Sequence, residues 1–135
     1  MEMYKLAKNI ATEAHEGQFR RDGKTPYIVH PEEVASHFNI NSIEACVAWL
    51  HDVVEDTDVT LERLRVIFLE EIVSAVDVLT KKPTDNYLQY ILEIFPNKIA
   101  KKVKLIDMKC NMIGATKNQK EKYILASFIL NDRVL

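Results

Sequence analysis

The sequence has little glycine, proline or cysteine: three, four and two residues in a chain of 135. With 47% of the residues apolar, this composition excludes a low-complexity or disordered chain and is typical of a compact fold. Cys46 and Cys110 lie far apart, and the chain shows no secretion signal. We therefore interpret them as reduced thiols of a cytoplasmic protein rather than as a disulfide.

Long apolar runs and a strong net charge are also missing. No apolar stretch approaches the roughly 20 residues that a bilayer-spanning helix needs, and residues 1–5 lack the features of a signal peptide. The net charge of −2 gives no reason to expect a nucleic-acid or membrane partner. The charge is uneven, however. Residues 97–122 contain eight lysines and two acidic residues, which is net +6 and leaves the rest of the chain at −8, so this segment could attract a phosphorylated ligand.

Apolar residues recur at helical spacing along nearly the whole chain, and no segment keeps the period of two that marks a strand. We expect one all-α domain over residues 1–135. Its first helix starts at Met3 and ends near Gly17. The further helices are expected over residues 31–38, from 43 through 51–57, 61–68, 72–79, 87–95, 99–112 and 123–130.

Local signals suggest how two of these helices begin. Pro31 suits the first position of its helix, because proline has a fixed φ and needs no amide partner there. Asn41 and Ser42 both offer an N-cap for the next helix, and Glu44 stands in capping-box position relative to Asn41.

The segment HDVVEDT at residues 51–57 gathers four side chains that can bind ligands or move protons. The six residues before it are almost all apolar, which predicts a central helix buried on most sides. Positions four apart share a helix face, so we expect His51 beside Glu55 and Asp52 beside Asp56. Such groups at the end of a buried helix are costly unless they are paired or bind a metal. The segment is therefore a candidate metal site.

Two further polar residues stand in apolar surroundings and could complete this site. His30 lies at a helix start and Asp107 on the inward side of a later helix. Singly, each would be read as a cap or as a buried hydrogen-bonding residue. Together with His51 and Asp52 they give two imidazoles and two carboxylates, a donor set that suits Mn²⁺, Fe²⁺ or Zn²⁺. Spacing alone does not choose among these ions.

These motifs resemble the HD-superfamily guanosine polyphosphate pyrophosphohydrolases, which include the hydrolase half of the RelA/SpoT alarmone enzymes and the small alarmone hydrolases. The resemblance runs from the first helix to about Met112. The HDxxED motif with an upstream GQxRxxGxPYxxHP-like segment is specific to that branch. The matching segments are Ala14-His15-Glu16-Gly17-Gln18, Arg20-Arg21, Gly23, Pro26-Tyr27, His30-Pro31, residues 51–57, residues 103–107 and Asn111-Met112.

The resemblance implies an all-α HD-type fold with a central buried helix and a metal site between helices. It implies a hydrolase that removes the 3′-pyrophosphate of ppGpp or pppGpp to give GDP or GTP. By position it implies one divalent cation, usually Mn²⁺, at His30, His51, Asp52 and Asp107. By position the resemblance also implies that Glu55 and Asp56 position or activate the attacking water. It implies that Arg20 and Arg21 contact the nucleotide and that Asn111 lies near the ribose. One departure is Met108, where the family commonly has a basic residue, and this leaves the preferred nucleotide open.

Three other interpretations stay open at this stage. The first is a phosphatase of the same fold that acts on another phosphorylated nucleotide, such as NADPH. The second is an all-α, Mg²⁺-dependent NTP pyrophosphatase, whose ExxE and ExxD motifs match residues 13–16 and 55–58 but which has no use for His30 or His51. The third is a non-catalytic nucleotide sensor, which need not keep all six metal-site and Glu-Asp residues. Assembly into a homo-oligomer is also left open.

Overall fold

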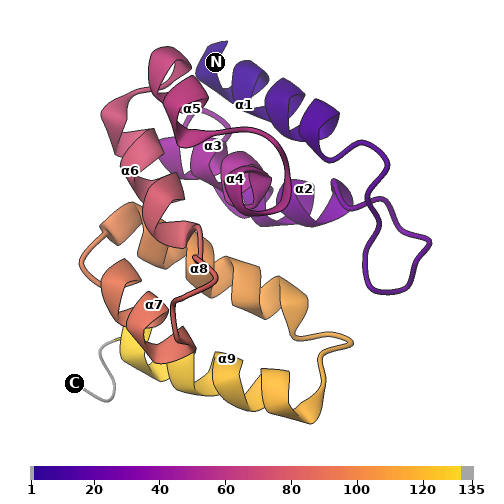
Figure 1. Ribbon diagram of the computed structural model, residues 1–135, viewed down its shortest axis with the longest axis vertical. Helices are drawn as coiled ribbons and strands as arrows, with labels where there is room; N and C mark the ends of the chain where they lie inside the picture. Colours follow the sequence, from indigo (N-terminus) through magenta and orange to yellow (C-terminus); the bar gives the residue numbers. More distant parts are fainter. Residues whose placement is uncertain (1, 132–135) are drawn as a thin grey trace.

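Helices make up the regular structure of residues 2–131, the part of the chain that the computed structural model describes (Figure 1). The predicted all-α fold class is confirmed. The helices are α1 (Glu2–Ala14), α2 (Val29–Ala35), α3 (Ile43–Leu50), α4 (Val53–Asp56), α5 (Leu61–Ile67), α6 (Glu70–Leu79), α7 (Tyr87–Ile94), α8 (Lys98–Asn111) and α9 (Lys117–Leu130).

Helix α3 lies in the middle of the fold and packs against α1, α2, α6 and α8 (Figure 1). Its residues Ala45 to Leu50 are all buried, as the apolar run predicts. Burying a side chain such as Leu50 contributes roughly 1.5–3 kcal/mol. Helix α9 packs against α7 and α8, on the side of the molecule away from α1. No helix within residues 2–131 is long and apolar enough to cross a membrane.

The helix starts differ from the prediction at three places. Ser42 caps α3 by accepting a hydrogen bond from the amide of Ala45, so the expected capping box of Asn41 and Glu44 is wrong. Helix α2 begins two residues before Pro31, which is tolerated because the first-turn amides have no acceptor within the helix. Helix α9 begins six residues earlier than expected because its N-cap and the third helical residue form a capping box, Thr116 with Gln119.

The helix expected to run through residues 51–57 is interrupted. Helix α3 ends at Leu50, and α4 is a separate single turn. Asp52, between them, has φ −108° and ψ −4°, away from regular α-helix values. The Ala48 carbonyl, the acceptor for residue 52 in a regular helix, accepts a 2.6 Å hydrogen bond from Nδ1 of His51 instead. Asp52 lies in this interruption, and its carboxylate belongs to the cluster described next.

Candidate metal centre

Four predicted ligand residues come together where α2, the end of α3 and α8 meet. One ligand atom from each of His30, His51, Asp52 and Asp107 lies within 4.8 Å of the others. Nε2 of His51 lies 3.2 Å from Oδ1 of Asp107 and 3.1 Å from Oδ2 of Asp52. Nε2 of His30 lies 2.7 Å from the same Asp107 oxygen. Residues distant in the sequence thus converge on one point in the core.

The chemistry of this cluster fits a divalent metal ion. Nδ1 of His51 donates to the Ala48 carbonyl, so Nε2 is the ring nitrogen that faces the cluster and that would give its lone pair to a bound ion on losing its proton. His30 and His51 are only 2% and 3% exposed, so their Nε2 atoms are shielded from bulk water. Two imidazole nitrogens and two carboxylates form a mixed donor set of the kind that binds Mn²⁺, Fe²⁺ or Zn²⁺. These four side chains can hold one metal ion.

The electrostatics of the cluster favour ionised carboxylates. Burial raises the pKa of Asp107, but the Lys104 ammonium and the two histidines outweigh burial and hold this pKa well below its usual value. Burial likewise raises the pKa of Asp52, but His51 and the hydroxyl of Tyr27 more than compensate, and the pKa falls to about 2. Both carboxylates are therefore ready to bind a cation at neutral pH.

The two carboxylates are held by two side chains to which the sequence analysis assigns no role in the site. The hydroxyl of Tyr27 donates to Oδ2 of Asp52. Burial and the nearby Asp52 raise the pKa of Tyr27, so its hydroxyl stays protonated and remains a donor. Nζ of Lys104 lies 3.1 Å from Oδ2 of Asp107. The sequence signal for Lys104 is its position three residues before Asp107, which places the two on one face of α8.

Glu55 and Asp56 flank the metal centre rather than joining it. Oε1 of Glu55 accepts a 2.8 Å hydrogen bond from the amide of Lys81, in the segment that follows α6. Among the hydrogen bonds and ion pairs of the described residues, none joins Glu55 to His51. The expected pairing of these two residues on one helix is wrong, because the helix is interrupted between them. Burial raises the pKa of both Glu55 and Asp56. The Asp56 carbonyl accepts from the side chain of Gln18, which ties α4 to the loop that follows α1.

The predicted nucleotide contacts, Arg20, Arg21 and Asn111, lie together beside this centre. The Arg20 guanidinium donates to Oδ1 of Asn111 at 2.8 Å, and Asn111 donates to Oδ1 of Asp107 at 3.1 Å. Arg21 donates to the backbone carbonyl of Asn111 at 3.3 Å and to Gln119 at 3.0 Å. A cavity of about 330 Å³ opens here, lined by Arg20, Arg21, Asp22, Ile113 and Gly114.

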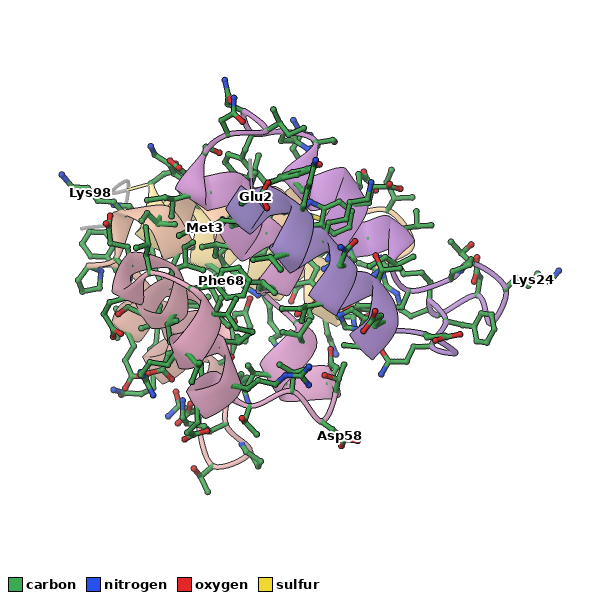
Figure 2. The ribbon with its side chains drawn as sticks, turned by 90° about the horizontal axis from the view of Figure 1, so that it is seen from above. Glu2, Met3, Lys24, Asp58, Phe68 and Lys98 are labelled. Atoms are coloured by element: carbon green, nitrogen blue, oxygen red, sulfur yellow. The ribbon has the colours of Figure 1, made fainter. Side chains whose placement is uncertain are left out.

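The loop that carries the two arginines is shaped by local hydrogen bonds. The Thr25 hydroxyl donates to Oδ2 of Asp22, and the amides of Thr25 and Lys24 donate to Oδ1. These three hydrogen bonds lower the pKa of Asp22 to about 2. Gly23 has φ +71°, a conformation that favours glycine. Figure 2 shows Lys24 at the outer tip of this loop, directed away from the helices.

Met108, which stands where the resemblance leads us to expect a basic residue, is buried in the core. Met108 is 1% exposed, and its sulfur lies 3.7 Å from the hydroxyl of Tyr87. The position directly after Asp107 therefore faces the core between α7 and α8. The positive group beside Asp107 is supplied one turn earlier, by Lys104.

Comparison with known proteins identifies relatives for this chain. No family model matches it. It is 36% identical over 131 residues to a protein of Haemophilus influenzae named guanosine-3′,5′-bis(diphosphate) 3′-pyrophosphohydrolase, covering 85% of this chain and 19% of that protein. It is 30% identical over 131 residues to the bifunctional (p)ppGpp synthase/hydrolase SpoT of Escherichia coli, covering 85% and 18%. The chain thus spans about a fifth of the length of these curated relatives.

A solved structure has the same fold. It is described as a metazoan ortholog of SpoT that hydrolyzes ppGpp and plays a role in starvation responses. The TM-score is 0.75 at 22% identity, and the match covers 99% of this chain and 86% of the other. Fold and site together define an HD-superfamily helical domain with a candidate metal centre between its helices. This chain is homologous to the RelA/SpoT-type ppGpp 3′-pyrophosphohydrolases, which confirms the resemblance predicted from its motifs.

Proposed function

We propose that this protein is a metal-dependent hydrolase that removes the 3′-pyrophosphate of ppGpp or pppGpp and returns GDP or GTP. The observation that carries this proposal is the convergence of His30, His51, Asp52 and Asp107 within 4.8 Å. The names of the homologous proteins supply the substrate class. The proposal extends to one HD-type domain over residues 1–135, supported by the single hydrophobic core of the described residues.

In this proposal the four clustered residues hold one divalent cation, and Mn²⁺ is the ion we expect. The imidazole and carboxylate donors suit Mn²⁺, Fe²⁺ or Zn²⁺ alike, and the expectation of Mn²⁺ among them rests on the resemblance to the HD-superfamily pyrophosphohydrolases. When bound, the cation would neutralise charge on the phosphate under attack and lower the pKa of a water molecule. We also propose a cytoplasmic location, supported by the unpaired Cys46 and Cys110.

Glu55 is the proposed general base. A useful base has a pKa raised toward the working pH, and burial raises the pKa of Glu55. The amide of Lys81 holds one carboxylate oxygen and so limits the orientations of the group. As the water oxygen bonds to the first phosphorus of the 3′-pyrophosphate, Glu55 takes a proton from that water. The bond from phosphorus to the 3′ oxygen breaks, and the 3′ oxygen takes up a proton from solvent. Asp56 is proposed to share in orienting the water.

The substrate is proposed to lie between two positive regions. Arg20 and Arg21 line the cavity on one side of the metal centre. Asn111 on α8, which accepts from Arg20, is proposed to contact the ribose. Lys104 lies on the other side, beside Asp107. A nucleoside with phosphates at both ends would use both regions, whereas GTP would use one. Met108 faces the core and presents no group to this site, so a phosphatase acting on another phosphorylated nucleotide, such as NADPH, stays as the second candidate that the substrate test separates.

A substrate panel tests the proposal. The purified protein is incubated with ppGpp, GTP or NADPH in the presence of Mn²⁺, and the products are separated by ion-exchange chromatography. We expect pyrophosphate and GDP from ppGpp and intact GTP, with an Asp52→Ala variant as the inactive control. If NADPH turns over while ppGpp does not, the alarmone assignment is wrong and only the fold and the metal centre remain.

A further inference from the structure

Tyr27 touches both parts of the proposed site. Its hydroxyl donates to Oδ2 of Asp52, the oxygen that lies 3.1 Å from Nε2 of His51. Its ring lies 4.8 Å from the ring of His15, measured between centroids, and the Arg20 guanidinium lies 5.7 Å from the Tyr27 ring centre. A single side chain thus connects the loop that carries the arginines to a predicted metal ligand.

Asp52 has a particular need for such a contact. It lies in the interruption between α3 and α4, where its backbone carbonyl accepts from the amide of Asp56 but its side chain makes no capping hydrogen bond, so helix bonding does not set the orientation of the carboxylate. A carboxylate that must place one oxygen within a small cluster gains from a hydrogen bond by a rigid partner, because that bond restricts its rotation. Tyr27 is rigid because its ring is packed beside His15 and Arg20.

We propose that Tyr27 is a positioning residue of the metal centre: its hydroxyl holds the Asp52 carboxylate in the orientation that binds the cation. The packed ring ties that orientation to the Arg20 loop. This inference rests on the metal centre of the proposed function. It concerns metal affinity and requires no particular substrate.

Tyr27→Phe is the variant that isolates the hydroxyl, because phenylalanine keeps the ring packed beside His15 and Arg20. We expect the dissociation constant for Mn²⁺ to rise roughly tenfold or more, as for the loss of other groups that orient metal ligands. We expect kcat to recover at saturating Mn²⁺, since the metal-binding groups themselves are unchanged. Calorimetric titration of the metal-free full chain with Mn²⁺ measures the affinity, and far-UV circular dichroism confirms that the variant is folded.

Tyr87→Phe is the matched control. It also removes one hydroxyl from a largely buried tyrosine, but that hydroxyl contacts the sulfur of Met108 and no metal ligand. We expect its Mn²⁺ affinity to equal that of the wild type. Unchanged affinity in Tyr27→Phe, or equal weakening in both variants, overturns the inference while leaving the metal centre intact. If the wild-type protein itself binds no Mn²⁺, the metal centre is wrong and the inference falls with it.

Discussion

Nε2 of His30 lies 2.7 Å from Oδ1 of Asp107, although 77 positions separate these residues in the chain. The contact joins α2 to α8, and both side chains are buried. A buried polar pair is costly to break, because removing one member leaves the other without a partner. The fold nevertheless buries imidazoles and carboxylates together in its core, and a site that binds a cation needs such groups there.

Loss of His51 should remove the metal. In His51→Ala the remaining ligands lose a nitrogen that contacts both carboxylates, and we expect less than one tenth of the wild-type Mn²⁺ content after dialysis, roughly the effect of losing a ligand outright. Hydrolysis should be abolished, and thermal stability should fall because the carboxylates are left partly unpaired. His37→Ala, at an exposed histidine outside the site, is the control. Stoichiometric metal in His51→Ala would show that this residue is not a ligand.

Glu55→Gln should separate chemistry from metal binding. Glutamine keeps an oxygen that can accept from the Lys81 amide, but it cannot accept the proton of the attacking water. We expect kcat to fall by roughly 10²-fold or more with unchanged Mn²⁺ content, and a smaller fall in Asp56→Asn. Glu62→Gln on the exposed face of α5 controls for loss of a carboxylate. Wild-type turnover in both site variants would mean that the proton is accepted elsewhere.

The raised pKa of Glu55 also predicts a pH-dependent stability. Burial, only partly offset by the Lys81 amide, raises this pKa above its usual value of 4.5, with Asp52 and Asp56 adding to the effect. The stabilisation by the protonated form is therefore complete below pH 4.5 and is lost as the pH rises through the folded-state pKa. Metal-free Glu55→Gln cannot ionise, so at pH 7 its melting temperature should exceed that of the wild type.

The gap should close when the same melts are repeated below pH 4.5, where Glu55 is protonated in both the folded and the unfolded chain. Chelator in the buffer keeps both proteins metal-free, and Glu62→Gln should show no comparable gap. A wild-type protein more stable than Glu55→Gln at pH 7 would contradict the direction of this pKa shift.

Arg20→Ala should act mainly on substrate binding. Arg20 donates to Asn111 and lines the cavity beside the metal centre, and it is not one of the four clustered residues that would hold the cation. A contact that is equal in the ground and transition states affects KM rather than kcat, so we expect KM for ppGpp to rise more than kcat falls. Lys24→Ala, at the outer tip of the same loop (Figure 2), should leave both constants unchanged. A larger effect on kcat than on KM would instead place Arg20 at the reacting phosphate.

Much of the fold could be predicted from sequence because its signals are local. The apolar run at residues 45–50 indicated the buried central helix, and its burial is confirmed. The helix ends were less predictable. The capping box of Thr116 and Gln119 extends α9 over a polar first turn that has no apolar spacing to mark it.

The contacts within the site could not be predicted from the spacing of residues in the sequence. A regular helix through residues 51–57 would pair His51 with Glu55, but a hydrogen bond from His51 to the Ala48 carbonyl accompanies the interruption of that helix. Tyr27 and Lys104 lie in motifs that the resemblance matched. The contact of Tyr27 with Asp52, however, joins residues 25 positions apart and forms only when the chain folds, and the contact of Lys104 with Asp107 becomes buried only when α8 is packed. The motifs indicated the predicted metal ligands, whereas the structure shows which side chains hydrogen-bond to these ligands.

The most direct test of the account is a titration of the metal-free protein with Mn²⁺ while pyrophosphate release from ppGpp is measured. Because one cluster of four donors is proposed to bind one cation, the rate should rise from near zero and reach its plateau at one equivalent of Mn²⁺ when the protein concentration is well above the dissociation constant. Release of pyrophosphate in the presence of excess chelator, or no release at any Mn²⁺ concentration, would contradict it.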